Sequence, residues 1–463
     1  MANYHPKYEL HYAAGKALRQ ACSRTLQAEN RLSAPRDVVA MVEQTSQGRV
    51  PGLIPLRYSR MQVSPFTFFR GFAMIQAADL AANPSSGLNL QICGDAHLMN
   101  YGFFASPERQ LIFDINDFDE THHGPWEWDL KRLAVSLVLA ARGQGFSESQ
   151  ARDMVCRASE VYRRRVNEYA RMGQLELWYT KVGFEQLLER APTDAIRQQM
   201  LKLSDKARHQ TQEKLLPKMT ELEDGTLRLR DNPPVIFHLH DKNTLLDNDD
   251  SWLSTSDAEA LVKPMLDNYI TTLKEDRRQL LERFRLVDCA FKVVGVGSVG
   301  TRCLVMLLQD NFDQPLFLQL KEARPSVLEP YTQACVHGHQ GKRVVFGQRL
   351  MQAASDLFLG WTTGPAGRHF YVRQLRDMKA APSLEAFTAP EALTAYGQAC
   401  AWALARAHSK SGGQAAKLAG YVGDSDKLDQ AIASYALAYA DQVEADYQVF
   451  KAAIASGRLQ AHD

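Results

Sequence analysis

The spacing of hydrophobic and polar positions changes several times along the chain, and each change predicts an element. Residues 66–82 have helical spacing, and the short apolar runs at 88–93 and 111–115 are typical of buried strands. The polar segments that follow these strands, 94–100 and 116–125, are predicted to be loops. The first fifty residues are polar and mixed, and they predict helical fragments or an arm. The polar side chains of this region are therefore concentrated in the loops of a strand–loop–strand unit.

A mainly helical stretch is predicted next. Helical spacing covers 129–141, and Ser147 and Gln150 form a capping box that begins a helix ending near residue 172. Residues 178–222 keep a helical character. A second capping signal predicts one long helix with an apolar face over 256–284.

From 290 to 319 the spacing is that of strands. A glycine cluster separates two apolar runs, and a turn at 309–315 leads into a third run that ends at Lys321, which is a hairpin signature. The remaining predicted elements are a helix at 339–354, a strand pair at 358–362 and 369–375, and helices at 391–409 and 428–455. This segregation of strands and helices predicts the α+β class.

Composition narrows the range of partners. The 463 residues carry 54 Lys and Arg against 53 Asp and Glu, a formal charge of +1, so bulk charge gives no reason to expect binding to nucleic acid or to an anionic membrane. The seven cysteines are odd in number and form no Cys-x-x-Cys pair, which favours reduced thiols and a cytoplasmic location. The longest apolar run, 133–141, is far shorter than the ~20 residues of a membrane span, and no leader segment is expected.

Two polar segments hold the side chains that phosphoryl transfer requires. Residues 94–100 read GDAHLMN, with Asp95 and Asn100, and the next strand is followed by Asp117 and Asp119. One carboxylate can orient an attacking hydroxyl, while an amide and a second carboxylate hold Mg²⁺ on a nucleotide. The alternative is a loop whose Asp and Asn side chains only cap turns and a helix.

A glycine-rich segment and a lysine form the second group. Gly295, Gly297 and Gly300 match G-x-G-x-x-G, which occurs in dinucleotide-binding turns and in loops that cover nucleotide phosphates. A dinucleotide-binding turn requires a helix beginning at about Gly300 and a parallel sheet, whereas the following residues have strand spacing as far as Lys321. The phosphate-covering hairpin of a kinase-like lobe has the same order of elements: a strand, a glycine loop, a second strand, a turn and a third strand that carries a lysine. A plain hairpin with a surface lysine is the alternative.

Together the two groups resemble the protein-kinase-like superfamily, and its small-molecule branch in particular. The order is reversed, because Asp95, Asn100 and Asp117 precede the glycine loop and Lys321. Catalysis depends on positions in space, and a chain whose termini lie close together tolerates permutation. The resemblance therefore implies a two-lobed, circularly permuted kinase-like fold. The expected segments are an N-terminal arm (1–50), the catalytic-loop and metal-motif part of the large lobe (51–145), a helical segment completing that lobe (146–284), a small β lobe (285–380) and C-terminal helices packing on the large lobe (381–463).

Longer strings are similar to a bacterial family known as domain of unknown function 2252. The similarity covers about residues 50–450. The matching strings are 94–102, 113–121, 124–132, 293–302, 347–353 and 371–379. The kinase-like character of this family implies an ATP- and Mg²⁺-dependent phosphotransferase whose partners are a nucleotide and an unknown, small-molecule acceptor.

The resemblance also implies roles for individual residues. Asp95 would orient the hydroxyl, His97 would order its loop, and Asp129, at the start of the next helix, would buttress that loop. Lys321 and the glycine N–H groups would hold phosphates, and 371–375 would lead into the adenine-contacting hinge. The implied residues are Asp95, His97 and Asp129 for catalysis, Gly295, Gly297, Ser298, Gly300, Lys321 and Arg373 for the nucleotide, and Asn100, Asp117 and Asp119 for the metal.

Two departures from the kinase-like pattern leave other functions open. Cys93 stands where small-molecule kinases carry His, and the helix at 339–354 contains no acid to pair with Lys321, with Glu329 and Gln348 as possible substitutes. A nucleotide-binding pseudokinase, or a kinase-fold enzyme that transfers another group, is the first alternative. A Rossmann-type enzyme that uses the glycine segment for a dinucleotide or an adenylate is the second.

Overall fold

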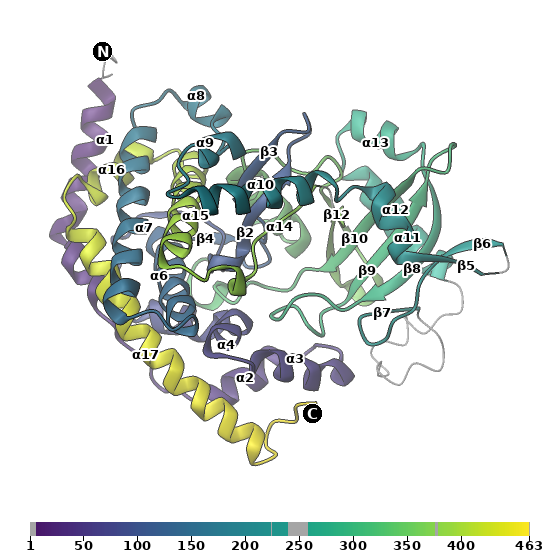
Figure 1. The fold of residues 1–463 in the computed structure, drawn as a ribbon, viewed down its shortest axis with the longest axis horizontal. Coiled ribbons are helices and arrows are strands. Elements are labelled where there is room, and N and C mark those ends of the chain that lie inside the picture. Colours follow the sequence, from purple (N-terminus) through teal and green to yellow (C-terminus); the bar gives the residue numbers. More distant parts are fainter. Residues whose placement is uncertain (1–5, 224, 239–257, 376–377, 463) are drawn as a thin grey trace.

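Helices make up one side of the molecule and a six-stranded sheet makes up the other (Figure 1). The computed structural model describes residues 6–223, 225–238, 258–375 and 378–462. We call residues 6–208 and 380–462 the helical part and residues 212–375 the sheet part. The largest apolar core lies mainly in the helical part, and two smaller cores cover the two faces of the sheet. The prediction of an α+β protein is confirmed.

Four long helices form the helical part: α6 (Trp126–Gly143), α7 (Glu148–Tyr169), α15 (Pro390–Ser411) and α17 (Lys427–Ala455). α6 is buried along almost its whole length and packs against α7, α15 and α17. The capping box predicted at the start of α7 is present, since Ser147 and Gln150 each accept a hydrogen bond from the other's backbone N–H. None of the described helices combines the length and the apolar character that a bilayer crossing requires.

Shorter helices surround these four. The helix predicted over 66–82 is divided into α4 and α5, because Phe72 has φ −139° and ψ 64°, which are not helical angles. The shorter helices of the helical part are α1 (Pro6–Ala17), α2 (Val38–Ser46), α3 (Ile54–Met61), α4 (Pro65–Gly71), α5 (Ala73–Ala81), α8 (Gln174–Tyr179), α9 (Phe184–Leu188), α10 (Asp194–Arg208) and α16 (Ala415–Val422).

The sheet part has the strand order β11-β12-β10-β9-β8-β7, and all its neighbouring strands are antiparallel. The predicted hairpin is confirmed, with Lys321 near the end of β10. Its strands are β7 (Ile236–Phe237), β8 (Arg285–Lys292), β9 (Cys303–Gln309), β10 (Pro315–Glu322), β11 (Gly360–Thr363) and β12 (His369–Gln374).

Different helices cover the two faces of this sheet. α12 (Ala258–Thr271) and α13 (Glu275–Leu281) lie on one face, whereas α11 (Gln212–Met219) and the hairpin of β5 (Thr220–Glu223) and β6 (Thr226–Leu229) lie on the other. The sequence predicts a single helix over 256–284, but the helix is interrupted between α12, which ends at Thr271, and α13, which begins at Glu275. Residues 256–257 lie outside the described residues. α14 (Gln340–Met351) packs on β11 and β12 and also touches α15, so it lies between the two parts.

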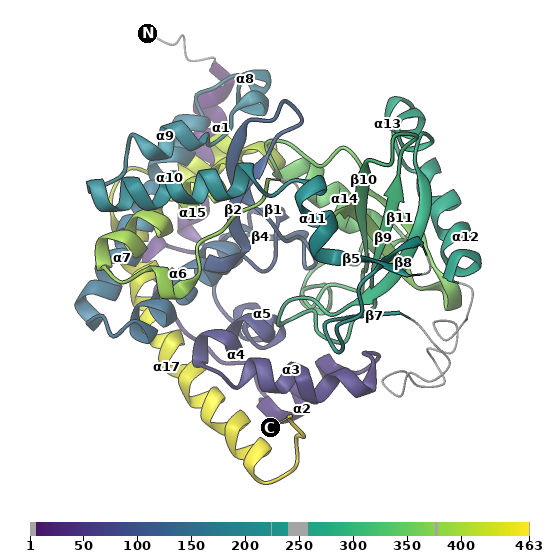
Figure 2. The ribbon, with the colours of Figure 1, turned by 45° about the vertical axis from the view of Figure 1, so that its right-hand side comes forward.

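Two small antiparallel pairs stand between the helices and the large sheet (Figure 2). β1 (Asn89–Ile92) pairs with β4 (His122–Pro125), and β2 (Tyr101–Ala105) pairs with β3 (Leu111–Ile115). β1 and β3 match the predicted strands. β4 falls in the segment predicted to be a loop, because its sequence HHGP has no apolar alternation and its pairing uses backbone groups. These pairings bring residues 93–100 and 116–121 together.

The connection from β12 back to the helical part is also fixed to this region. Phe103 in β2 and Ala380 exchange both of their backbone hydrogen bonds, with N···O distances of 2.7 and 2.9 Å. The chain then continues through 381–389 into α15. The segment that leaves the sheet is therefore joined to the hairpin that begins directly after Asn100.

Candidate functional site

The two polar segments lie side by side. The backbone N–H of Asn116 donates to the carbonyl of Asn100 at 2.7 Å. Gly94 has φ +79°, and a Cβ atom at this position would lie 2.3 Å from the carbonyl oxygen of Glu120. Only glycine combines this left-handed backbone with so close an approach. The glycine of the GDAHLMN string is therefore required for the contact between the two segments.

Asp129 holds the start of the first loop. It lies in the first turn of α6, and its carboxylate accepts the backbone N–H groups of Cys93 at 2.8 Å and of Gly94 at 2.9 Å. His408 of α15 contacts the same carboxylate at 3.1 Å, and both side chains are buried. This is the buttressing position that the resemblance implies. Asp129 does not line the cavity described below, and its carboxylate positions the loop through these two backbone groups.

Asp95 makes an ion pair that sequence reasoning missed. Arg132 Nε donates to Asp95 Oδ1 at 2.6 Å, and its other nitrogens donate to Gln76 Oε1 and to the carbonyl of Phe69 at 3.0 and 2.8 Å. Burial raises the pKa of Asp95 although Arg132 opposes this effect. Arg132 lies three residues after Asp129, hence on the same face of α6, and this spacing is a signal that could have identified it.

His97 and Asn100 both act on the loop itself. The ring nitrogen Nδ1 of His97 accepts the N–H of Met99 at 3.2 Å, while its Nε2 lies 3.8 Å from the Asp95 carboxylate. Burial holds the pKa of His97 well below its usual value, so the ring is neutral at pH 7. Asn100 Nδ2 donates to the carbonyl of Asp95 at 2.7 Å, which leaves its amide oxygen as the atom suited to a cation.

Lys321 meets the metal-motif acids. Its ammonium group forms an ion pair with Asp119 and lies 3.6 Å from Asp117 Oδ2. Asp119 also accepts hydrogen bonds from the hydroxyl groups of Tyr371 at 2.7 Å and Ser298 at 3.2 Å. One carboxylate therefore contacts β10, β12 and the glycine segment.

The charges of this group depend on one another. Burial works against ionisation of Asp117, but Lys321 and Arg373 outweigh it and hold the pKa of Asp117 below its usual range. Although burial also disfavours a charged lysine, Asp117 and Asp119 keep the pKa of Lys321 well above its usual value. Asp117 and Lys321 are therefore both charged at pH 7, as in a buried pair whose partners compensate each other.

The partner of Lys321 is not one of the two substitutes weighed from the sequence. Glu329 accepts the N–H of Cys335 at 3.0 Å, and Gln348 donates to Gln352 at 2.9 Å. α14 instead contributes Arg343, which donates to the carbonyls of Asp119 at 2.8 Å and of Thr121 at 2.6 Å. The helix is thus fastened to the segment that carries Asp119 rather than to the lysine.

The glycine segment connects β8 to β9 and is held from the N-terminal region. Gly295 and Gly300 have φ values of +67° and +85°, which favour glycine. Arg60 donates to the carbonyl of Gly295 and Arg49 to that of Val299, both at 2.6 Å. β9 begins at residue 303 and pairs antiparallel with β10. The helix and the parallel sheet that a Rossmann turn requires are replaced by a hairpin, so that alternative does not fit the fold.

A cavity of about 380 Å³ brings most of the predicted residues together. This volume is at the lower end of the ~300–1,000 Å³ range common for small-molecule sites. The guanidinium Nε of Arg70 is buried there without a hydrogen-bond partner. The predicted residues that line the cavity are Asp95, His97, Asn100, Asp117, Asp119, Gly295, Gly297 and Ser298, and the cationic residues that line it are Arg49, Arg57, Arg70 and Arg324.

Arg373 borders a second cavity of about 390 Å³. Its guanidinium donates to the carbonyl of Asn116 and to the side chain of Gln319, both at 3.2 Å. Asn116, Leu375 and Lys379 also line this second cavity. Of the predicted nucleotide residues, Gly295, Gly297 and Ser298 thus line the first cavity and Arg373 the second, whereas Gly300 and Lys321 line neither. The two cavities adjoin the consecutive residues Asn116 and Asp117.

The donor set meets the needs of a divalent cation only in part. Among the described residues there is no group of three or more His, Cys, Asp and Glu side chains that could hold a metal ion. Mg²⁺, however, is commonly held by one or two carboxylates together with substrate phosphates and water. Asp117, Asp119 and the amide oxygen of Asn100 fit that requirement, provided that a nucleotide supplies the other oxygens.

A protein-family model matches most of the chain. No curated protein and no solved structure matches it. A family model described as an uncharacterized protein conserved in bacteria (DUF2252) matches residues 49–453, which include every residue of the site described above. The chain therefore belongs to the DUF2252 family.

Proposed function

We propose that this protein is an ATP- and Mg²⁺-dependent phosphotransferase with a circularly permuted, kinase-like fold and a small-molecule acceptor. The observation that carries the proposal is the convergence of Asp95, Asn100 and Asp117 with the glycine segment at one cavity. Lys321 does not line this cavity itself but pairs with Asp117 and Asp119, which do. Phosphoryl transfer needs a residue that orients the hydroxyl, two oxygen ligands for the metal and donors for phosphate. All of them lie within this one group.

The topology supports the same proposal. A kinase-like small lobe has a glycine hairpin, a strand that carries the lysine, a helix and two further strands, and β8 to β12 with α14 follow this order. The loop of Asp95 and the segment of Asp117 lie on the paired strands β1–β4 and β2–β3, which precede the small lobe in sequence. The order of the two groups is reversed, as permutation requires.

Individual atoms have distinct parts in this proposal. Arg132 holds Oδ1 of Asp95, so Oδ2 is left to orient the acceptor hydroxyl. A carboxylate whose pKa is raised is also a better proton acceptor. Lys321 and the N–H groups of the glycine segment would bind phosphate oxygens, and Mg²⁺ would neutralise charge on the phosphates. The base of the nucleotide would lie in the second cavity, beside Leu375 and Lys379.

A non-catalytic, nucleotide-binding function is the second candidate. The ion pair of Asp95 with Arg132 favours it, because a carboxylate that is already neutralised orients a hydroxyl less strongly. Transfer of another part of the nucleotide is compatible with the same residues. These candidates differ in which part of ATP is cleaved.

The experiment measures ATP binding and turnover in the full chain. ATP with Mg²⁺ should raise the unfolding temperature more than ATP with EDTA does. Label from γ-³²P-ATP should be released or transferred, and Asp95→Asn should lower that rate by ~10²–10⁴-fold while the ATP-dependent thermal shift remains. Asp441→Asn is the matched control, since that side chain is 68% exposed and lies in α17.

The outcomes separate the candidates. ATP binding without release of γ label, in the wild type and in Asp95→Asn alike, would leave the non-catalytic function. Transfer of label from α-³²P-ATP to the protein would replace phosphoryl transfer with nucleotidyl transfer. A chain that gives no Mg²⁺-dependent shift with ATP contradicts the whole proposal.

A further inference from the structure

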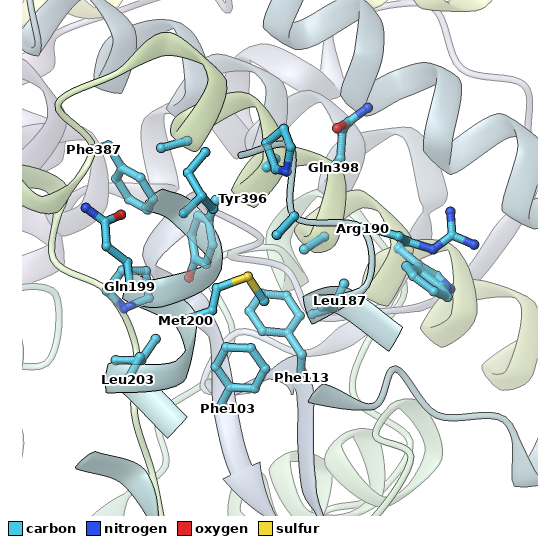
Figure 3. Close-up of a pocket in the computed structure, with 18 of the residues that line it drawn as sticks. Phe103, Phe113, Leu187, Arg190, Gln199, Met200, Leu203, Phe387, Tyr396 and Gln398 are labelled. Carbon is cyan, nitrogen blue, oxygen red and sulfur yellow. The ribbon is translucent and has the colours of Figure 1, made fainter. Parts of the chain in front are cut away.

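A third cavity, larger than the two described above, lies in the helical part, away from the site of Asp95. Its volume is about 1,170 Å³, and none of its lining residues borders the other two cavities. It is enclosed by α7, α9, α10, α15 and the segment 381–388 (Figure 3). The volume exceeds the ~300–1,000 Å³ of common small-molecule sites. A long or bulky ligand is needed to fill it.

The interior of this cavity is apolar. Phe103 of β2 and Phe113 of β3 face it together with Met200 and Leu203 of α10 (Figure 3). The two phenyl rings meet edge to face with centroids 5.1 Å apart. The hydroxyl of Tyr396 is already bonded to the carbonyl of Tyr101 at 2.9 Å. Apolar and aromatic side chains thus predominate in the lining, which favours a mainly apolar occupant.

The mouth of the cavity is cationic. Its charged lining residues are Arg164, Arg165, Arg190, Lys202 and Lys206 against a single acid, Glu168. Arg165 pairs with Glu168 at 2.6 Å and Arg164 pairs with Glu160 at 2.6 Å. No carboxylate pairs with Arg190, Lys202 or Lys206 within the part of the chain that the structure describes. Lys202 and Lys206, one turn apart on α10, are thus available to one anion, and Arg190, which follows the end of α9, adds positive charge to the same lining.

Arg190 and Arg165 also stand over the same aromatic ring. Their guanidinium carbons lie 5.1 and 3.7 Å from the ring centroid of Trp402, which lines the cavity. The aromatic face keeps both cations close to the apolar interior. The positive charge therefore begins where the apolar surface ends, which is the division found in an amphipathic anion.

We propose that this cavity binds a long-chain carboxylate of the fatty-acid class. The hydrocarbon chain lies against Phe103, Phe113 and Met200, and the carboxylate meets Lys202 and Lys206 at the mouth. Guanidinium and ammonium groups form charge-assisted hydrogen bonds with carboxylates, and the buried chain supplies the apolar contact that the interior lacks. The site is independent of the proposed phosphotransferase activity, because the two share no lining residue.

The occupant would also contact the segment that follows the sheet. Residues 381–388 form one wall of the cavity, directly after Ala380, and Phe103 belongs both to the cavity and to the backbone pair with Ala380. Binding should therefore slow amide hydrogen exchange in 381–388 and in β2. This gives the proposal a readout that does not depend on activity.

Calorimetric titration with dodecanoate is the test, with dodecyltrimethylammonium and 1-dodecanol as probes of equal chain length. We expect dodecanoate to bind at a stoichiometry of one, at least tenfold more tightly than either control. The double variant Lys202→Glu/Lys206→Glu should weaken binding about tenfold, because two attractive charges become repulsive. The double variant Arg197→Glu/Arg208→Glu, with exposed positions on the far side of α10, changes net charge equally and should have an effect below threefold.

Three results would overturn the proposal. These are equal binding of the cationic and anionic probes, an equal loss of affinity in both double variants, and exchange in 381–388 that dodecanoate leaves unchanged. Binding to anionic phospholipid vesicles without binding of monomeric dodecanoate would assign the charged mouth to a membrane surface instead. Ala395→Trp fills the cavity from α15 and should abolish dodecanoate binding while the surface charges remain.

Discussion

Replacing Asp129 by Asn tests how the loop at residues 93–100 is held. The carboxylate of Asp129 accepts the backbone N–H groups of Cys93 and Gly94 on its two oxygens, and His408 contacts Oδ2. An Asn side chain has almost the same shape but offers one acceptor oxygen and one amide group. Whichever way the amide is turned, one buried N–H faces another N–H.

The size of the effect follows from these contacts. Leaving a buried N–H without a partner costs about 1–3 kcal/mol, and turning the other charge-assisted bond into a neutral one costs about 1 kcal/mol more. Asp129 and His408 are at most 1% exposed, so water does not replace the lost bonds. We expect the free energy of opening the loop to fall by about 2–4 kcal/mol. This corresponds to roughly 30- to 1,000-fold faster exchange of the Cys93 and Gly94 amide hydrogens.

Hydrogen exchange measured by mass spectrometry, on a peptide that contains residues 89–98, reports this opening directly. Asp153→Asn is the control, because its pair with Arg157 has both side chains more than half exposed and contributes under about 0.5 kcal/mol. Exchange in this peptide that changes less than threefold in Asp129→Asn would refute the anchoring role. The same peptide should be unaffected in the control.

Three further predictions concern charge and backbone. Lys321→Met should lower the urea midpoint at pH 7 and lose the ATP-dependent thermal shift. The loss of stability should shrink as pH falls towards 4, because Asp117, whose pKa Lys321 holds down, then takes up a proton in the variant. A deficit that is the same at both pH values would contradict this. Burial lowers the pKa of Lys131 to about 8, so between pH 8 and about 10.4 the unfolded chain binds a proton that the folded chain does not. The stability of the wild type should therefore rise with pH across that range relative to Lys131→Met, as urea titrations can check. Gly94→Ala should destabilise the loop by more than the ~1–2 kcal/mol of a left-handed alanine, because its Cβ would overlap the carbonyl of Glu120, and normal exchange of the 89–98 peptide would argue against that overlap.

Local signals predicted much of this fold. The capping box of α7, the strands β1 and β3 and the hairpin of β9 and β10 each depend on residues close in sequence, and all are present. The missed elements lack such signals. The break between α4 and α5 has apolar residues on both sides, and β4 is a strand only because β1 pairs with its backbone.

The candidate site also combines features that have local sequence signals with contacts between residues far apart in sequence. The short strings place Asp95, Asn100 and Asp117 near one another, and the paired strands account for that proximity. The bond from Tyr371 to Asp119 joins residues 252 positions apart, and no spacing in one sequence indicates it. For the same reason the sequence directs attention to a helix for the partner acid of Lys321, whereas that acid is Asp119, in the segment between β3 and β4.

The contact between Lys321 and Asp119 has a thermodynamic consequence. Under the proposed function, the carboxylate of Asp119 binds a cation and the ammonium of Lys321 binds a phosphate. In this structure the two side chains form an ion pair with each other instead. A ligand that draws one partner away makes the second available, so the two ligands should bind with positive cooperativity. Linkage makes this coupling reciprocal, with a typical size of about 1–3 kcal/mol. Nucleotide without cation, or cation without nucleotide, must still break the ion pair unaided, and the protein thus discriminates against either ligand alone.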